Sequence, residues 1–266
     1  MPTVPGSEDI AAGAQSLLAE LGVPRSAFEA GPLLRLLRIG APIGAQHQLE
    51  YGVFAVVGLL MGAMGTAQVA GHQVALNLAS LTFMVPLGLS AASAVVVGHA
   101  VGRGDHQAAS ESARAALYVA IGFMGATAAI FLLLPGPLAR FYTDAPEVLA
   151  IAVVLIPLAG VFQVFDGIQV TSIGILRGLG DTGTPMWTGI LGFWLVGLPA
   201  SLILGFTLGF GPAGLWWGLV LGLVAVASAL AVRLRHRLRQ PLRRVRLDHP
   251  PVLEGQPVRA LPGAEA

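Results

Sequence analysis

Cysteine is absent from the 266 residues, and lysine is absent as well, so that all 15 basic residues are arginine. Without cysteine the chain can form no disulfide, thiolate nucleophile or cysteine-based metal site. Charged residues make up only 11% of the sequence, whereas soluble domains typically contain about 25%. Hydrophobic residues make up 55%, and the mean hydropathy is +0.76. So few charges cannot cover a water-facing surface, and the composition therefore predicts an integral membrane protein.

Long uncharged stretches separate the few charged positions and define the predicted membrane spans. A transmembrane helix needs about 20 apolar residues. Residues 39–102 have room for two helices, with a turn expected near Gly62, Gly65 and Gly71. The other predicted spans are residues 115–139, 148–176 and the two parts of 182–232, which breaks at 209–212. Because lipid offers the backbone no hydrogen bonds, the spans should be helices. We predict an all-α polytopic membrane protein with a six-transmembrane-helix bundle.

The arginines predict the orientation of this bundle. With six spans, every basic residue except Arg140 falls on the same side of the membrane. The positive-inside rule places that side, with both termini, in the cytoplasm. We expect the bundle to lie in the plasma membrane, which is the inner membrane if the chain is bacterial. We expect residues 1–33 to form a cytoplasmic amphipathic linker, 34–234 the membrane lobe and 235–266 a disordered basic cytoplasmic tail. The tail arginines either attract anionic lipid headgroups or act only as a topology signal.

Two acidic residues, Glu50 and Asp166, lie well inside predicted spans. An acid at the centre of a membrane helix costs roughly 2.5–3.5 kcal/mol on insertion scales, and such residues usually serve an ion or proton pathway. Each could carry a proton and release it when water or a cation arrives. Their oxygens also suit a hard cation such as Na⁺. The structural alternative is a protonated acid that hydrogen-bonds a neighbouring helix.

Polar and aromatic residues flank both acids at helical spacing. Gln46 and His47 precede Glu50 by one turn, and His47 could exchange protons or pair with Glu50. Phe162 and Gln169 lie one turn before and after Asp166. An aromatic ring beside a carboxylate suits an organic cation. The alternatives are interhelical hydrogen bonds for the polar residues and simple packing for Phe162.

Nothing in the sequence predicts an enzyme or a cofactor. Residues 178–183, GLGDTG, match the dinucleotide pattern literally but lie between two predicted membrane helices instead of after a strand. His72, His99 and His106 lack metal-ligand spacing with acids, so the only metal ion that the sequence suggests is Na⁺ at Glu50 and Asp166.

Glycines recur at four-residue spacing in two places, at Gly58 and Gly62 and again at Gly214, Gly218 and Gly222. This spacing predicts close helix packing.

Several segments together resemble the MATE (multidrug and toxic compound extrusion) family, NorM-type branch. GHQVALN at 71–77 resembles the start of the family's eighth helix. PLGLSAAS at 86–93 and VGHAVG at 97–102 resemble the end of that helix, and GILRGLGD at 174–181 resembles the cytoplasmic end of the tenth. Glu50 and Asp166 fall where this branch places acids in helices seven and ten. The resemblance covers nearly the whole membrane part.

The resemblance implies a fold and an activity. Family members have two six-helix lobes and export amphipathic organic cations in exchange for H⁺ or Na⁺, and the second lobe binds the coupling cation through its two acids. This sequence departs from the pattern because the first lobe is missing. Phe162 stands where a tyrosine is common, so a hydroxyl ligand is lost, which favours H⁺. Val96 replaces a usual arginine.

The sequence therefore predicts the C-terminal lobe of a multidrug antiporter in the lipid bilayer, with Glu50 and Asp166 binding the coupling ion. Its expected partners are organic cation substrates and an N-terminal lobe, encoded in the same gene or as a separate chain. A homodimer is the other possibility, because an even number of spans gives both copies one orientation. No nucleic-acid partner is expected. The rival hypotheses are a non-transporting membrane scaffold and a lipid-linked oligosaccharide flippase of the same superfamily, although the spans lack the cationic residues that a pyrophosphate would require.

Overall fold

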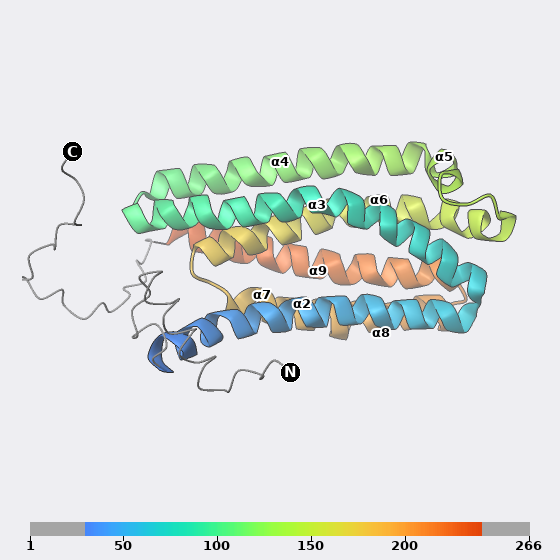
Figure 1. Ribbon diagram of the computed structural model, residues 1–266, viewed down its shortest axis with the longest axis horizontal. Coiled ribbons are helices and arrows are strands. Elements are labelled where there is room, and N and C mark those ends of the chain that lie inside the picture. Colours follow the sequence, from blue (N-terminus) through green and yellow to red (C-terminus); the bar gives the residue numbers. More distant parts are fainter. Residues whose placement is uncertain (1–29, 241–266) are drawn as a thin grey trace, which may run out of the picture.

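The computed structural model describes residues 30–240, and this part of the chain is helical throughout apart from short turns. Long helices lie side by side along one axis (Figure 1). The predicted linker at 1–33 and tail at 235–266 lie almost entirely outside the described residues. The first helix begins at Ala30 and the last continues to Arg239, past the predicted boundaries at 34 and 234. The helices in chain order are α2 (Ala30–Met64), α3 (Thr66–Arg103), α4 (His106–Leu133), α5 (Pro135–Arg140), α6 (Pro146–Gly178), α7 (Gly183–Gly189), η2 (Ile190–Gly197), α8 (Leu198–Leu202), η3 (Ile203–Thr207) and α9 (Gly211–Arg239).

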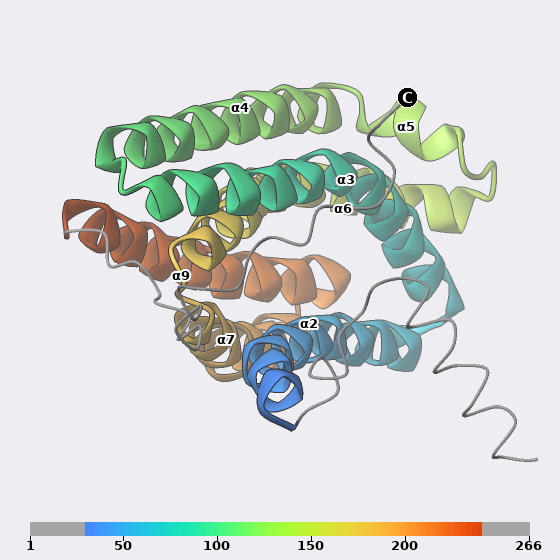
Figure 2. The same ribbon diagram turned by 60° about the vertical axis from the view of Figure 1, so that its left-hand side comes forward.

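Five segments of the described chain are long and apolar enough to cross a membrane: α3, α4, α6, α9 and the stretch 183–207 that contains α7 to η3. The remaining predicted span, the first in chain order, corresponds to α2, which has 35 residues and lies alongside the other helices in Figure 1 and Figure 2. Gln46, His47, Gln48 and Glu50 interrupt the apolar sequence of α2, which is not among these five segments. The prediction of an all-α bundle of membrane helices is confirmed.

Glycines with positive φ angles form two of the predicted turns. The chain reverses between α2 and α3 at Gly65, whose φ is 143°. Gly209 and Gly211 turn the chain into α9 with φ of 73° and 58°. These positive values suit residues without a Cβ. Gly62 and Gly71 lie within helices, so the expectation that they belong to the first turn was wrong.

The fifth span has an irregular backbone. Two π-helical segments, η2 and η3, flank the short helix α8, which contains Pro199. Proline has no backbone N–H and cannot continue an α-helical ladder, so a wider turn accommodates it. The glycines of α9 at 214, 218 and 222 face this span so closely that a Cβ on Gly218 would lie 2.2 Å from the Ser201 amide nitrogen. The predicted close packing is confirmed there, but a Cβ added to Gly62 would have no atom of another element within 4 Å.

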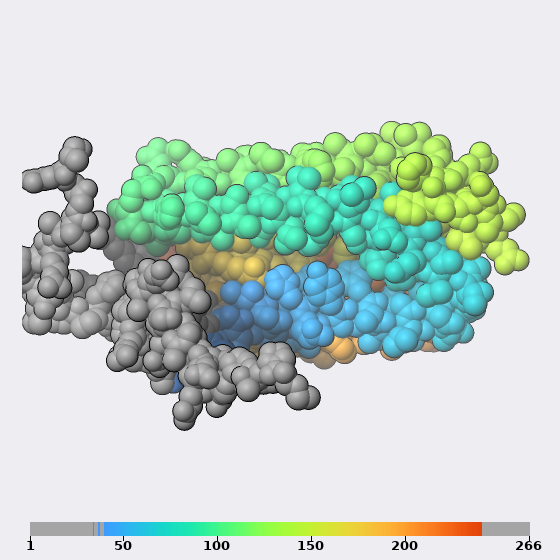
Figure 3. Space-filling view, in the orientation of Figure 1, coloured from blue at the N-terminus to red at the C-terminus, as the bar shows by residue number. Residues whose placement is uncertain are grey.

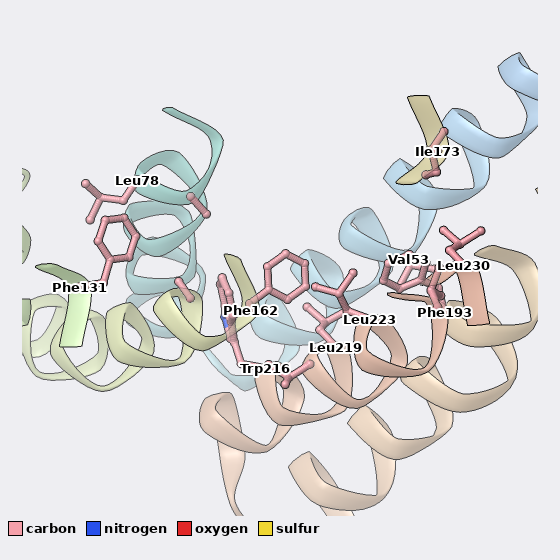
Figure 4. Close-up of a cluster of buried hydrophobic side chains, with 14 of the residues drawn as sticks. Val53, Leu78, Phe131, Phe162, Ile173, Phe193, Trp216, Leu219, Leu223 and Leu230 are labelled. Carbon is pink, nitrogen blue, oxygen red and sulfur yellow. The ribbon is translucent and has the colours of Figure 1, made fainter. Parts of the chain in front are cut away.

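The helix α6 forms the centre of the bundle and packs against α3, α4 and α9. Its buried face joins the apolar core, where Phe162 lies near Trp216 and Leu219 of α9 (Figure 4). The helix α2 packs its backbone mainly against α3 and α7. In Figure 3, a furrow separates α2 from α3, and gold atoms of α6 form part of its floor. Side chains therefore make the contacts between α2 and α6.

Asp181 fastens the loop between α6 and α7 to the end of α9. Its Oδ2 accepts a hydrogen bond from Arg233 Nε at 2.9 Å, and its Oδ1 accepts one from the Thr184 amide at 3.2 Å. Arg237 lies 4.0 Å from the same Oδ2. Burial alone would raise the pKa of Asp181, but the hydrogen bonds from Thr184 and Arg233 outweigh burial and hold the pKa below its ordinary value.

Replacing Asp181 by asparagine should lower the free energy of unfolding by about 1 kcal/mol at neutral pH, because the ion pair is partly exposed and the amide oxygen can still accept the hydrogen bond from the Thr184 amide. Because the pKa of Asp181 is lower in the folded chain than its ordinary value of 3.8, the charged group stabilises the fold at pH values above 3.8. That contribution disappears as the pH falls through the folded-state pKa. Thermal unfolding in detergent should show the difference between wild type and D181N closing below about pH 4. A difference that persists unchanged in acid would contradict this role for the charge.

Candidate functional site

The two membrane acids lie on different helices, Glu50 on α2 and Asp166 on α6, and Gln169 of α6 contacts Glu50. Gln169 Nε2 donates a hydrogen bond of 2.7 Å to Glu50 Oε1. These residues are 119 positions apart in the chain, so this contact belongs to the tertiary fold. Glu50 is partly buried, while Gln169 retains only 2% of its exposure. The bond fixes the Glu50 carboxylate against the central helix.

Asp166 lies one turn before Gln169 on α6, where spacings of three residues share a face. It is buried, with 9% of its surface exposed, and it is close enough to Glu50 for the two carboxyl groups to repel each other when both are charged. Two neighbouring carboxyl groups with little water around them do not readily carry two negative charges. A proton or a cation between α2 and α6 would relieve that repulsion.

Gln169 also supplies an unused oxygen. Its Oε1 is buried and has no hydrogen-bond partner within residues 30–240. A buried acceptor without a partner costs free energy unless a donor or cation reaches it. With the carboxyl oxygens of Glu50 and Asp166, this amide oxygen makes an oxygen-only donor set, which a proton or a hard cation such as Na⁺ would suit. No cluster of three or more histidine or acidic residues occurs in the described chain.

Phe162 borders the acids on the side away from Gln169. Its ring meets Phe54 of α2 edge-on at 5.8 Å and Trp216 of α9 at 6.1 Å between centroids. Trp216 in turn donates a hydrogen bond of 3.2 Å to Nδ1 of the buried His72. The ring of Phe162 provides no oxygen, and with Phe54 and Trp216 it forms an aromatic wall. Figure 4 shows Phe162 and Trp216 of this wall.

Gln46 and His47 contact an arginine instead of Glu50. Arg177 Nη2 lies 3.4 Å from Gln46 Oε1 and 3.4 Å from His47 Nε2. No described contact joins His47 to the Glu50 carboxylate, so the predicted pairing of these two residues is absent in this structure. Arg177 also acts electrostatically on Glu50. The site therefore has a cationic end near the arginine-rich side of the bundle.

Sequence reasoning missed the contribution of Arg177, although a signal was present. Residues 169, 173 and 177 follow one another at spacings of four, so Arg177 lies on the helix face that carries Gln169. A second polar cluster was also missed. Gln163 Oε1 accepts hydrogen bonds from Thr82 and Thr127, which ties α6 to α3 and α4 on another side. Val96 is half exposed on α3 and nothing in the structure explains its identity.

The fold and the site together define a polytopic membrane protein with paired acids inside its helix bundle. Intramembrane acids of this kind mark ion pathways in transport proteins. The family model MatE matches residues 42–203, which is more than half of the chain. The chain belongs to the MatE family, as its sequence resemblance predicts.

Two groups of relatives support this assignment. The chain is 44% identical over 205 residues to a protein of Xanthomonas axonopodis pv. citri named "Probable multidrug resistance protein NorM", covering 77% of this chain and 45% of the relative. It is 39% identical over 213 residues to the multidrug resistance protein MdtK of Edwardsiella ictaluri, covering 79% and 47%. The chain thus spans about half the length of the curated relatives it matches.

Solved structures confirm the fold. The Vibrio cholerae MATE transporter VcmN in its bent form superposes with a TM-score of 0.70 at 21% identity, covering 87% of this chain and 53% of that one. The eukaryotic MATE transporter AtDTX14 gives a TM-score of 0.72 at 20% identity, covering 87% and 56%. Members of the MatE family are transporters, in agreement with the prediction that the chain is not an enzyme. At these identities the solved structures establish the arrangement of helices alone.

Proposed function

We propose that this chain is the C-terminal half of a secondary active multidrug exporter, which releases amphipathic organic cations in exchange for H⁺ or Na⁺. The observation that carries the proposal is the hydrogen bond from Gln169 to Glu50, which joins Glu50 of α2 to the helix that carries Asp166 one turn before Gln169. The names of the NorM and MdtK relatives, both multidrug resistance proteins, support efflux as the activity.

The site would couple two ligands through charge. When the pair of acids holds a proton or a cation, it has less attraction for a cationic drug. When the coupling ion leaves, the exposed negative charge attracts the drug, and the aromatic wall at Phe162 and Phe54 accommodates its apolar part. Because the two ligands neutralise the same charge, each lowers the affinity for the other, which is the thermodynamic requirement for exchange.

H⁺ fits this donor set better than Na⁺. Na⁺ requires several oxygen ligands, and Phe162 contributes none. A proton needs only one carboxyl group and an acceptor, and the unpartnered Gln169 Oε1 is such an acceptor. Arg177 at the end of the site would repel a second cation. We therefore propose H⁺ as the coupling ion.

A second lobe would complete the transport path. Alternating access usually requires two bundles that rock around a shared site, and the relatives are about twice as long as the matched region. We propose an N-terminal lobe, in the same gene or in a separate chain, as the partner, with a second copy of this chain as the alternative. The arginine-rich end of the bundle would lie on the cytoplasmic side of a bacterial inner membrane.

Transport in everted membrane vesicles tests the function and the ion together. The gene would be expressed with its native flanking coding sequence in cells that lack their own exporters, and ethidium would serve as the cation. An acid-inside pH gradient should drive ethidium uptake, and dissipating the gradient should stop it. A sodium gradient at equal pH should have little effect.

Two results would contradict the proposal in different ways. Uptake driven by sodium alone would support the antiporter but show that its coupling ion is Na⁺ instead of H⁺. Absence of uptake under every gradient, from vesicles that contain the inserted protein and its flanking sequence, would reject the exporter and favour a non-transporting role. Comparing the size of the native protein with the 27.4 kDa of this chain would show whether a first lobe is attached.

A further inference from the structure

A second site is present on the bundle, away from the paired acids. The helices α4, α6 and α9 enclose an open groove of about 670 Å³ near the arginine-rich end. All three helices reach that end of the bundle in Figure 1. Apolar side chains such as Leu117, Ile168 and Leu238 line the groove, and Arg114, Arg235 and Arg239 lie along it.

The arginines of α9 divide into two groups with different surroundings. Arg233 and Arg237 lie 2.7 Å and 4.0 Å from Asp181 Oδ2, so this one negative charge offsets part of their positive charge. Arg235 and Arg239 alternate with them along the helix and line the groove instead. With Arg114 of α4, they are exposed, and none of these three arginines has a carboxylate partner in the part of the chain that the structure describes. The groove therefore presents uncompensated positive charge beside apolar walls.

The position of the groove indicates what binds there. Its walls belong to helices that are long and apolar enough to cross a membrane, and its arginines lie near the helix ends. Tyr118, one turn after Arg114, is 74% exposed at the groove, and tyrosine is enriched where membrane meets water. Basic pockets between membrane helices bind anionic headgroups. A ligand that is apolar at one end and anionic at the other would match both parts of the groove.

We propose that this groove binds an anionic phospholipid, with its phosphodiester held by Arg114, Arg235 and Arg239 and its acyl chains along the apolar walls. Behind the floor of the groove lies Ser172, which is fully buried and whose hydroxyl has no hydrogen-bond partner within the described residues. The site is distinct from the acid pair. Ile168 and Ser172 of α6 line the groove together with residues of α4 and α9. Gln169 of the same helix instead contacts Glu50 of α2, a helix that does not line the groove.

Binding of phosphatidylglycerol to the full chain in nonionic detergent tests this proposal, with phosphatidylcholine as the neutral lipid. Each arginine near an anionic lipid headgroup strengthens binding roughly fivefold. The double variant R235Q/R239Q should therefore bind phosphatidylglycerol about 30-fold more weakly. Its affinity for phosphatidylcholine should stay unchanged. The variant R114Q, on a different helix, should lose about fivefold, which guards against a local effect on α9.

A matched control removes the same number of charges from the adjacent tail. R243Q/R244Q should bind phosphatidylglycerol as the wild type does, because the proposed site is the groove. Equal loss in the tail variant would overturn the proposal in favour of general attraction by the basic terminus. Equal loss for both lipids in R235Q/R239Q would indicate damage to the groove itself and would also overturn it. Competition by inorganic phosphate as strong as by the lipid would identify an ion site and contradict a lipid site.

Discussion

Replacing Asp166 by asparagine should reduce drug transport to the background of membranes without the protein, and Glu50→Gln should have the same effect. An amide cannot release a proton at any pH, and it has no charge to attract a cation. Each variant thus keeps the shape of the site but loses the property that exchange requires. Ethidium efflux from intact cells and uptake by vesicles would both measure the loss.

The substitutions should leave folding and insertion intact. The amide of E50Q still offers an oxygen to Gln169 Nε2, so the contact between α2 and α6 can persist. Removing an acid from the membrane interior also lowers the cost of insertion, which is roughly 2.5–3.5 kcal/mol on insertion scales. The amount of variant in the membrane and its thermal stability in detergent should therefore equal or exceed those of the wild type.

The chain offers matched controls for both substitutions. Glu111 of α4 and Asp144, between α5 and α6, are exposed acids far from the site in sequence. E111Q and D144N make the same chemical changes and should transport ethidium at the wild-type rate. Full activity in E50Q and D166N would disprove the coupling role of the acids. Lost activity accompanied by lost stability would favour the structural alternative, in which protonated acids hold the helices together.

Proton release separates coupling from drug binding. If drug and proton compete for the acids, adding ethidium to the purified wild-type protein in weak buffer should release protons. D166N and E50Q should release fewer, even at drug concentrations that saturate them. Drug binding without any proton release by the wild type would count against H⁺ as the competing ion.

The membrane helices can be predicted from the sequence, and two acids inside them can be located in it, because both depend on composition along a single helix. Charges are expensive in lipid, so uncharged stretches locate the helices and an isolated acid stands out. Contacts between helices are harder to predict, because they depend on how each helix is rotated about its axis. His47 lies one turn from Glu50 in sequence, yet its ring contacts Arg177 of α6. The pattern identifies neighbours within α2 but not the partner that α6 supplies.

The irregular fifth span shows another limit of sequence reasoning. Pro199 predicts a disturbance of the helix, but a kink, a break and a widened turn all satisfy proline. The structure has π-helical turns on both sides of α8, beside the glycine face of α9. The choice depends on that tertiary packing, which the proline itself does not encode.

The glycines of the segment GILRGLGD have a packing role that leads to the second large prediction. A Cβ on Gly174 would lie 2.2 Å from the carbonyl oxygen of Ser90 on α3, and one on Gly178 would lie 2.8 Å from that of Ala94. Both distances are far below contact distance, and both partners are backbone atoms, which cannot rotate away. Ser90 Oγ also donates a hydrogen bond of 2.7 Å to the Val170 carbonyl. The helices α3 and α6 thus approach each other through small residues from two of the segments that resemble the family.

Gly174→Val should therefore lower the free energy of unfolding by about 3 kcal/mol, at the upper end of the usual cost of overpacking. Gly125→Ala is the matched control, because Gly125 lies inside α4 with no neighbour within 4 Å of an added Cβ. Alanine there should raise stability by roughly 0.5–1 kcal/mol through helix propensity. Unfolding in mixed detergent micelles would measure both changes, and equal stability of G174V and wild type would refute the close approach of α3 and α6.

Because α6 carries Asp166, Gln169 and Arg177, pushing it away from α3 should also alter the contact with Glu50. Ser90→Gly should rescue G174A only in part, because it removes the side chain of residue 90 but leaves its carbonyl oxygen in place. Such a partial rescue would locate the strain at this crossing of α3 and α6.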